Sequence, residues 1–149
     1  MGEQPAGRWA LLAGLLLLSL TAGRASQRWE TLEAIHMVEN PSDTTRAGRF
    51  GELGAYQFRE MTWRMHTPEP FSHALDRQRS DDIAVRHYDW LQRGLERAGL
   101  PGTAYNIALA WNGGLQNVVR GRANAAAHDY ADRVSNLAAE LGHSALTKN

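Results

Sequence analysis

The chain has 149 residues, in which 16 lysines and arginines balance 16 aspartates and glutamates, and it contains no cysteine. This length predicts a single domain. The zero formal net charge and the lack of a contiguous basic patch argue against a nucleic-acid partner. Without cysteine, disulfides, thiolate catalysis and thiolate metal sites are excluded, so the fold must be stabilised by its core.

The first 25 residues are typical of a secretory signal peptide. A short start that carries Arg8 precedes an apolar run over 9–20, and the small residues that follow favour cleavage after Ala25. The run is shorter than the ~20 residues that a spanning helix needs, and an uncleaved membrane anchor stays open as the alternative. We therefore expect export to the periplasm or cell envelope, no stable membrane anchor after processing, and a mature domain over 26–149.

Hydrophobic periodicity predicts that the mature domain is mostly helical. Pro, Gly and Ser residues mark a loop after the first helix, and a short extended or turn-like piece follows it. Five or so helices around one irregular segment predict an all-α fold, or α+β at most, with a small vestigial hairpin. The expected helices cover 27–38 with Ser26 as N-cap, 58–65, 81–98 after Ser80, 103–111 and 123–141, with a turn over 115–119 and a frayed tail from Ser144. The tryptophans expected in the core are Trp29, Trp63 and Trp90.

Glu39 is the first candidate site residue. It ends the first helix on the face that carries Leu32 and Ile35, so its carboxyl is expected to be partly desolvated, which raises a carboxyl pKa. A raised pKa keeps a proton available near neutral pH, as a general acid for a glycosidic oxygen requires. A glutamate at this helix end also opposes the helix dipole. The alternative is an ordinary surface glutamate.

Two further segments combine glycine, aromatic and amide side chains. Gly54 lets the backbone approach a ligand or take positive φ, Tyr56 offers a flat face to a pyranose ring, and Gln57 offers a donor and an acceptor. Trp111 and Asn112 supply a similar stacking face and hydrogen bonder at the end of a helix. The plainer interpretations are a tight turn with a capping glutamine, and a buried tryptophan before an Asn-Gly helix cap.

Together these segments resemble, in order and spacing, the motifs of the lysozyme-like lytic transglycosylases and the similar goose-type lysozymes. Glu39 matches the family's glutamate, and Gly54 and Gln57 match its Gly-Leu-Met-Gln motif. Residues 110–114 match its Ala-Tyr-Asn-Ala-Gly motif with Trp in place of Tyr, and Tyr130 matches a tyrosine in a late helix.

The resemblance covers roughly residues 31–137, nearly the whole mature chain. It has three departures. Asn40 stands where the family has Ser, Glu52 stands where small residues are usual, and the segment 65–79 has no counterpart.

This resemblance implies a lysozyme-like helical domain that acts on peptidoglycan. The activity would be cleavage of the β-1,4 bond between N-acetylmuramic acid and N-acetylglucosamine, in which one glutamate acts as acid and then as base and leaves 1,6-anhydromuramic ends. The implied roles are acid/base for Glu39, sugar contacts for Tyr56, Gln57 and Trp111, support of the cleft floor for Asn112, and hydrogen bonding or orientation of Glu39 for Tyr130.

A second carboxylate would change the reaction, because retaining and inverting glycosidases need two. Glu52 and Asp43 are the candidates, since both follow Glu39 in the loop or turn expected to border the cleft. A hydrolytic outcome would make the protein a lysozyme, with Glu52 favoured over Asp43.

The remaining residues indicate no cofactor. The six histidines are scattered without a HExxH motif, so no metal site is expected, and neither a glycine-rich phosphate loop nor a Gly-x-Ser-x-Gly elbow occurs. The expected partners are peptidoglycan glycan strands and an envelope-spanning machine, and the protein is expected to be a monomer. Two rival functions stay open: a lysozyme-type or chitinase-like glycoside hydrolase of the same fold, and a non-catalytic glycan-binding or structural secreted domain.

Overall fold

The computed structural model describes residues 27–147, of which 67% are helical and none lies in a strand. The expected all-α class is therefore confirmed. No helix within this range is both long enough and apolar enough to cross a bilayer. The predicted signal peptide, 1–25, and Ser26 lie outside the described residues. The elements in chain order are a helix over 27–39, α2 (Glu60–Arg64), the 3-10 helix η1 (Phe71–Leu75), α3 (Arg77–Arg97), α4 (Ala104–Gly113), α5 (Leu115–Val119) and α6 (Ala125–Leu146).

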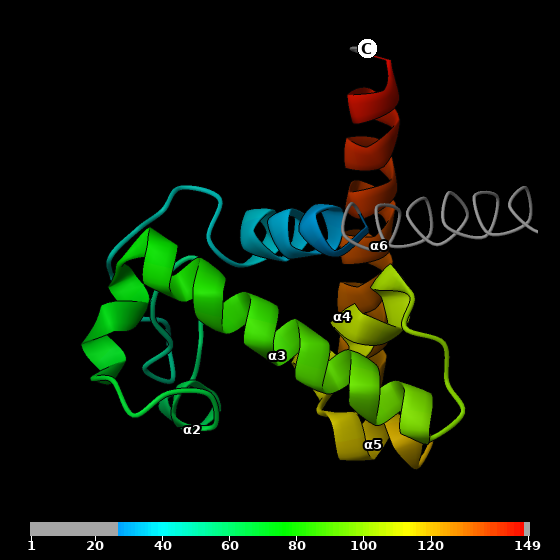
Figure 1. Cartoon of the computed structure of the whole chain (residues 1–149), viewed down its shortest axis with the longest axis horizontal. Helices are drawn as coiled ribbons and strands as arrows, with labels where there is room; N and C mark the ends of the chain where they lie inside the picture. Colours follow the sequence, from blue (N-terminus) through cyan, green and yellow to red (C-terminus); the bar gives the residue numbers. More distant parts are fainter. Residues whose placement is uncertain (1–26, 148–149) are drawn as a thin grey trace, which may run out of the picture.

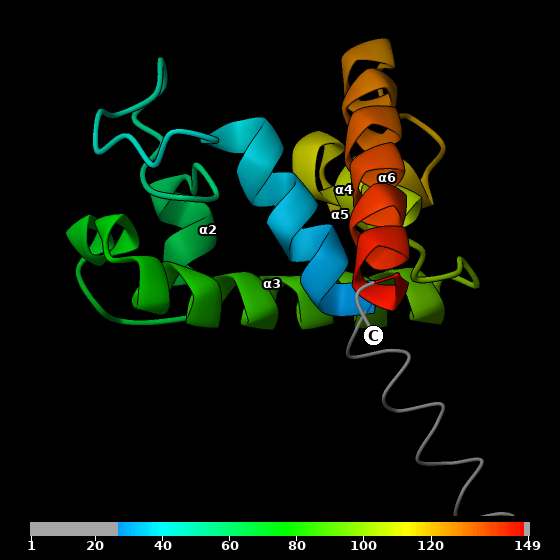
Figure 2. The same ribbon diagram turned by 90° about the horizontal axis from the view of Figure 1, so that it is seen from above.

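The long helix α3 runs across the molecule and connects its two halves (Figure 1). It contacts η1 in one half and α4 and α5 in the other, while α4 packs most extensively against α6. Seen from above, helix 27–39 lies between α2 and α6 (Figure 2). The C-terminal end of this helix leads into the segment 40–59, which precedes α2.

The core is a single cluster of buried apolar side chains to which every described helix contributes. Full burial of each large side chain contributes about 1.5–3 kcal/mol. Trp63 is fully buried, as expected, but Trp29 is 51% exposed and Trp90 is half-buried, so the core assignment is wrong for Trp29 and only partly right for Trp90. The largest buried side chains are Trp63, Tyr56, Leu32, Ile35, Leu91, Leu95, Ile107 and Val134.

Two helices have boundaries that differ from the prediction, α3 at its start and α6 at both ends. Asp76 caps α3 by accepting a hydrogen bond from the Arg79 amide at 2.9 Å, so the helix begins before Ser80, which is fully buried inside it. Asn124 caps α6 in the same way, and that helix continues to Leu146 instead of fraying from Ser144.

The segment between helix 27–39 and α2 contains the expected vestigial hairpin. Leu53 and Phe58 exchange two backbone hydrogen bonds of 3.0 Å across a four-residue turn. Because Phe58 is held in this bridge, α2 begins at Glu60, two residues later than expected. Within the turn, Gly54 and Gln57 have φ values of +79° and +45°, and only glycine takes such values without strain.

Asn40 fastens the end of helix 27–39 to this turn. Its Nδ2 donates to the carbonyl oxygens of Gly54 at 3.2 Å and Thr44 at 3.0 Å, and its Oδ1 accepts from the Thr44 amide at 3.0 Å. The side chain is 3% exposed, and each of these hydrogen bonds is worth about 0.5–1.5 kcal/mol net. Asn40 thereby fixes the position of Glu39 relative to the hairpin.

Candidate active-site cleft

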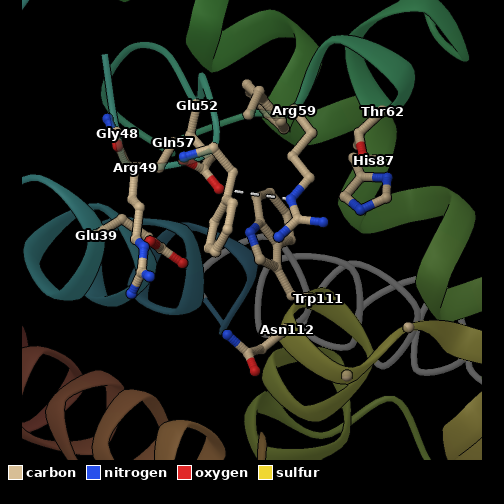
Figure 3. A pocket seen from close by; sticks show the side chains of 14 residues that line it. Glu39, Gly48, Arg49, Glu52, Gln57, Arg59, Thr62, His87, Trp111 and Asn112 are labelled. Atoms are coloured by element: carbon tan, nitrogen blue, oxygen red, sulfur yellow. Dashed lines mark hydrogen bonds and ion pairs between the residues drawn. The ribbon is translucent and has the colours of Figure 1, made fainter. Parts of the chain in front are cut away.

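A cleft of about 510 Å³ opens where helix 27–39, the loop from residue 48 to residue 59, and α4 meet (Figure 3). Its lining combines acidic, basic, amide and aromatic side chains. The lining residues are Glu39, Gly48, Arg49, Phe50, Glu52, Gln57, Phe58, Arg59, Thr62, His87, Trp111, Asn112, Gly113 and Gly114.

The cleft brings together five of the residues that the sequence singled out. Glu39 enters from helix 27–39 on one side, and Trp111 and Asn112 enter from α4 on the other, with Glu52 and Gln57 above them in Figure 3. These side chains come from segments that are far apart in sequence. The other predicted residues, Tyr56, Tyr130 and Asp43, do not line the cleft.

Burial raises the pKa of Glu39 above the ordinary value for a glutamate. The Tyr130 hydroxyl opposes this shift, the charge of Glu52 adds to it, and the charge of Arg133 opposes it. The net effect favours the protonated carboxyl. Because the side chain also reaches the cleft, Glu39 combines a raised pKa with access to a ligand, as the sequence predicted.

Tyr130 is buried in α6 beside Glu39, and it is 4% exposed. Burial, followed by the charge of Glu39, raises the pKa of the phenol well above its usual value. Within residues 27–147 the hydroxyl makes no hydrogen bond of regular geometry. The hydroxyl is therefore in polar contact with Glu39 without a formed hydrogen bond. Tyr130 lies next to Glu39, as predicted. It does not line the cleft, however, so it is not placed to contact a substrate directly.

Glu52 is the second carboxylate of the cleft, and its pKa is lowered. Its side chain is 16% exposed, and burial opposes the shift, but hydrogen bonds from backbone amides, including that of Phe50 at 2.9 Å, and the charge of Arg59 outweigh burial. The Arg59 Nε lies 3.5 Å from its Oε1. The pKa of Glu52 is therefore shifted towards the charged form, whereas that of Glu39 is shifted towards the protonated form.

Asp43, the other candidate for a second carboxylate, lies outside the cleft. Its Oδ1 is 2.9 Å from His36 Nε2 and 3.8 Å from Arg77 Nη1, and it borders a separate hollow. The interpretation of Asp43 as a second catalytic acid is wrong in this geometry.

Gln57 both caps its own turn and lines the cleft. Its Nε2 donates to the Gly54 carbonyl oxygen at 2.9 Å. A Cβ on Gly48 would lie 2.8 Å from Gln57 Oε1 and 2.5 Å from Glu52 Oε2. Glycine at position 48 therefore allows the loop backbone to approach both side chains.

The placement of Tyr56 against a sugar ring is wrong. This side chain is 1% exposed, does not line the cleft, and donates from its hydroxyl to Asp81 Oδ1 at 2.7 Å. The strained turn points it into the core, where its ring packs 6.1 Å from Trp111 and 5.8 Å from Phe58. Tyr56 supports the wall of the cleft from behind.

Replacing Tyr56 with phenylalanine is therefore expected to lower stability and leave the cleft unchanged. A buried hydrogen bond to a carboxylate is worth about 1.5–3 kcal/mol. We expect a loss near the lower value, because Arg77 still pairs with Asp81 at 2.9 Å. Chemical denaturation measures the loss, and glycan binding measured beside it should not change. A large loss of binding at unchanged stability would return Tyr56 to the sugar-contacting set.

Aromatic neighbours hold Trp111 in place. Its ring centroid lies 5.7 Å from that of Phe58 and 4.8 Å from that of His87. His87 in turn stacks on Trp90 at 5.6 Å and meets His66 through a 3.0 Å contact between ring nitrogens. Burial, with the charge of His66, lowers the pKa of His87 to about 3, so His87 is neutral near neutral pH.

Sequence reasoning missed several lining residues, namely Arg49, Phe50, Arg59, Thr62 and His87. The only sequence signal was at His87, a polar residue between Ile83 and Trp90 on the core-facing side of α3. The others lie in or next to the loop, whose conformation depends on tertiary contacts.

Among the described residues, no group of three or more His, Asp or Glu side chains is arranged to hold a metal ion. Comparisons with protein-family models, with curated proteins and with solved structures give no match for this chain. The functional argument therefore depends on the geometry of the cleft.

Proposed function

We propose that the protein is a peptidoglycan lytic transglycosylase with a lysozyme-like fold, exported to the periplasm or cell envelope, and that Glu39 is its acid and base. One observation carries this proposal: a half-buried carboxyl with a raised pKa reaches a cleft that also presents an indole and two amides. The cleft volume of about 510 Å³ is within the range of roughly 300–1,000 Å³ typical of ligand sites.

In the proposed reaction Glu39 donates its proton to the glycosidic oxygen, and the bond between that oxygen and C1 of the muramic sugar breaks. Positive charge develops at C1, where the substrate's own acetamide group stabilises it. Glu39, now a carboxylate, takes the proton from the 6-hydroxyl of the same sugar. The 6-oxygen then bonds to C1 and forms the 1,6-anhydro ring, so no water is consumed.

In this proposal four cleft residues, and Tyr130 behind Glu39, have supporting roles. The fixed indole of Trp111 offers a stacking face, and Gln57 and Asn112 offer hydrogen bonds to hydroxyl or acetamide groups. The Tyr130 hydroxyl, next to Glu39, stabilises the carboxylate form that appears after proton donation. Glu52 holds the loop through Arg59 and the Phe50 amide.

A second candidate function, hydrolysis, is favoured by one specific observation. Glu39 and Glu52 line the same cleft, and their environments shift their pKa values in opposite directions. Two carboxyls with pKa values shifted in opposite directions are expected when one acts as acid and the other as base or nucleophile. In that case water would enter the product.

Digestion of purified sacculi in oxygen-18 water tests the proposal against this alternative. The proposed reaction gives anhydro ends without the label, whereas hydrolysis gives reducing ends that carry oxygen-18. Labelled reducing ends that disappear in the Glu52→Gln variant would overturn the transglycosylase proposal in favour of a lysozyme-type enzyme.

The pH dependence of the reaction is expected to move when Glu52 is replaced with glutamine. The rate falls as pH rises through the pKa of Glu39, because a general acid must be protonated. Burial is the largest cause of the raised Glu39 pKa, and the charge of Glu52 raises it further. Removing that charge should therefore lower the Glu39 pKa and move the fall in rate to lower pH.

A profile of kcat/KM against pH measures this shift. Asp43→Asn is the matched control, because it removes a carboxylate that lies outside the cleft. A limb that stays in place in the Glu52→Gln variant, or moves equally in both variants, would contradict the coupling of the two glutamates.

A further inference from the structure

The tip of the loop from Gly48 to Glu52 presents an exposed aromatic ring at the rim of the cleft. The loop is closed by hydrogen bonds from the Gly48 amide to the Glu52 carbonyl at 2.8 Å and from the Gly51 amide to the Gly48 carbonyl at 3.1 Å. Its tip residue, Phe50, is 70% exposed and lines the cleft. The Phe50 amide donates to the Glu52 carboxylate at 2.9 Å, which ties the tip to the cleft wall.

Two guanidinium groups lie against this ring. The Cζ of Arg49 is 5.4 Å from the Phe50 centroid and that of Arg59 is 5.6 Å from it, both within cation–π range. Arg59 also pairs with Glu52, but within residues 27–147 no carboxylate lies at ion-pair distance from Arg49. The loop therefore presents two guanidiniums, those of Arg49 and Arg59, against one carboxylate, that of Glu52, so the rim carries a formal positive charge in a chain of zero net charge.

We propose that this cationic rim, formed by Arg49, Phe50 and Arg59, binds the carboxylates of the short acidic peptides attached to the glycan strand. The cleft would then select peptide-bearing strands over neutral ones. This inference rests on the proposed function, which assigns the glycan strand to the cleft. The inference adds the peptide substituent that the rim recognises.

The position of the three side chains favours a substituent over the sugar itself. Arg59 is 66% exposed in its side chain and Phe50 is 70% exposed, whereas Trp111 is packed among aromatic rings deeper in the cleft. A sugar held on Trp111 directs its attached peptide outward, towards the rim. Carboxylates match the two guanidiniums in charge, and an exposed ring can contact the methyl groups of small apolar residues in the peptide.

The test compares binding of two ligands that differ only in charge. One is a soluble glycan oligomer with free carboxylates on its peptides, and the other is the same oligomer after amidation of those carboxylates. The protein carries Glu39→Gln so that the ligand is not cut. We expect the free-acid form to bind about two- to fivefold more tightly at low salt, the size of an exposed ion pair, with the difference shrinking as salt is added.

Arg49→Gln should reduce this discrimination, because it leaves Arg59, which is paired with Glu52, as the one guanidinium of the rim. Arg46→Gln is the matched control, because it removes the same charge from the same segment between helix 27–39 and α2, at a position that does not line the cleft. Equal binding of the two oligomers by the parent protein, or discrimination that is undiminished in Arg49→Gln, would overturn the inference and leave the proposed function standing. Failure to bind either oligomer would overturn both.

Discussion

Replacing Glu39 with glutamine is expected to lower the rate of glycan cleavage by about 10²–10⁴-fold, the usual contribution of a general acid or base. Glutamine keeps the size and shape of the side chain but has no acidic proton to donate. The measurement is the initial rate of solubilisation of labelled sacculi. A variant that retains most of the rate would remove Glu39 from the reaction.

The same substitution is expected to raise stability at neutral pH. The folded-state pKa of Glu39 lies above its unfolded value, so the stability that this group contributes is present below the unfolded pKa and is lost as pH rises through the folded pKa. An uncharged glutamine avoids this loss. Chemical denaturation should therefore show an advantage for glutamine at neutral pH that shrinks in acid.

Glu33→Gln is the matched control for this experiment. Glu33 is on the same helix, but its side chain is 44% exposed and pairs with Arg77 at 3.2 Å outside the cleft. Loss of an exposed pair costs at most about 1 kcal/mol, and the cleavage rate should be unchanged. If both variants lost activity equally, the effect would belong to the helix and not to the acid.

Replacing Gly54 with alanine is expected to be the most destabilising of these changes. An alanine Cβ at this position would overlap the backbone carbonyl oxygen of Ala74, and the φ of +79° is unfavourable for any residue with a Cβ. The left-handed conformation costs roughly 1–2 kcal/mol, and forcing the backbone of η1 away adds about 1–3 kcal/mol. The sum of about 2–5 kcal/mol is a large part of the 5–15 kcal/mol typical of a domain.

Gly99→Ala separates the two contributions. Gly99 has a similar φ of +75°, but a Cβ there meets nothing within 4 Å, so only the conformational cost applies. The difference between the two variants in the free energy of unfolding isolates the overlap with Ala74. Equal losses in both variants would contradict the packing of the hairpin against η1.

The sequence predicted the helices better than their ends. Apolar residues at helical spacing located α3, α4 and α6, because their periodicity reflects the same burial that stabilises them. The start of α3 was misplaced because Ser80 and the acidic pair after it resemble a helix start. The actual cap, Asp76, follows a 3-10 helix for which the sequence contains no clear signal.

The residues of the candidate site also fall into two groups, those that the sequence could predict and those that it could not. Glu39 could be predicted because its burial follows from helix periodicity, and Trp111 and Asn112 because they end a helix next to two glycines. The direction of Tyr56 could not be predicted, since it depends on positive φ values at Gly54 and Gln57 that turn the chain inward. Likewise the rim residues Arg49 and Phe50 are placed by loop hydrogen bonds, which leave no periodic pattern.

Mass spectrometry of the soluble muropeptides released from purified sacculi tests the central claim most directly. The protein over residues 26–149 should release fragments with 1,6-anhydromuramic ends, and its Glu39→Gln variant should release none. Absence of soluble fragments with the unaltered protein, at every pH at which the protein stays folded, would contradict the claim and favour a non-catalytic glycan-binding domain.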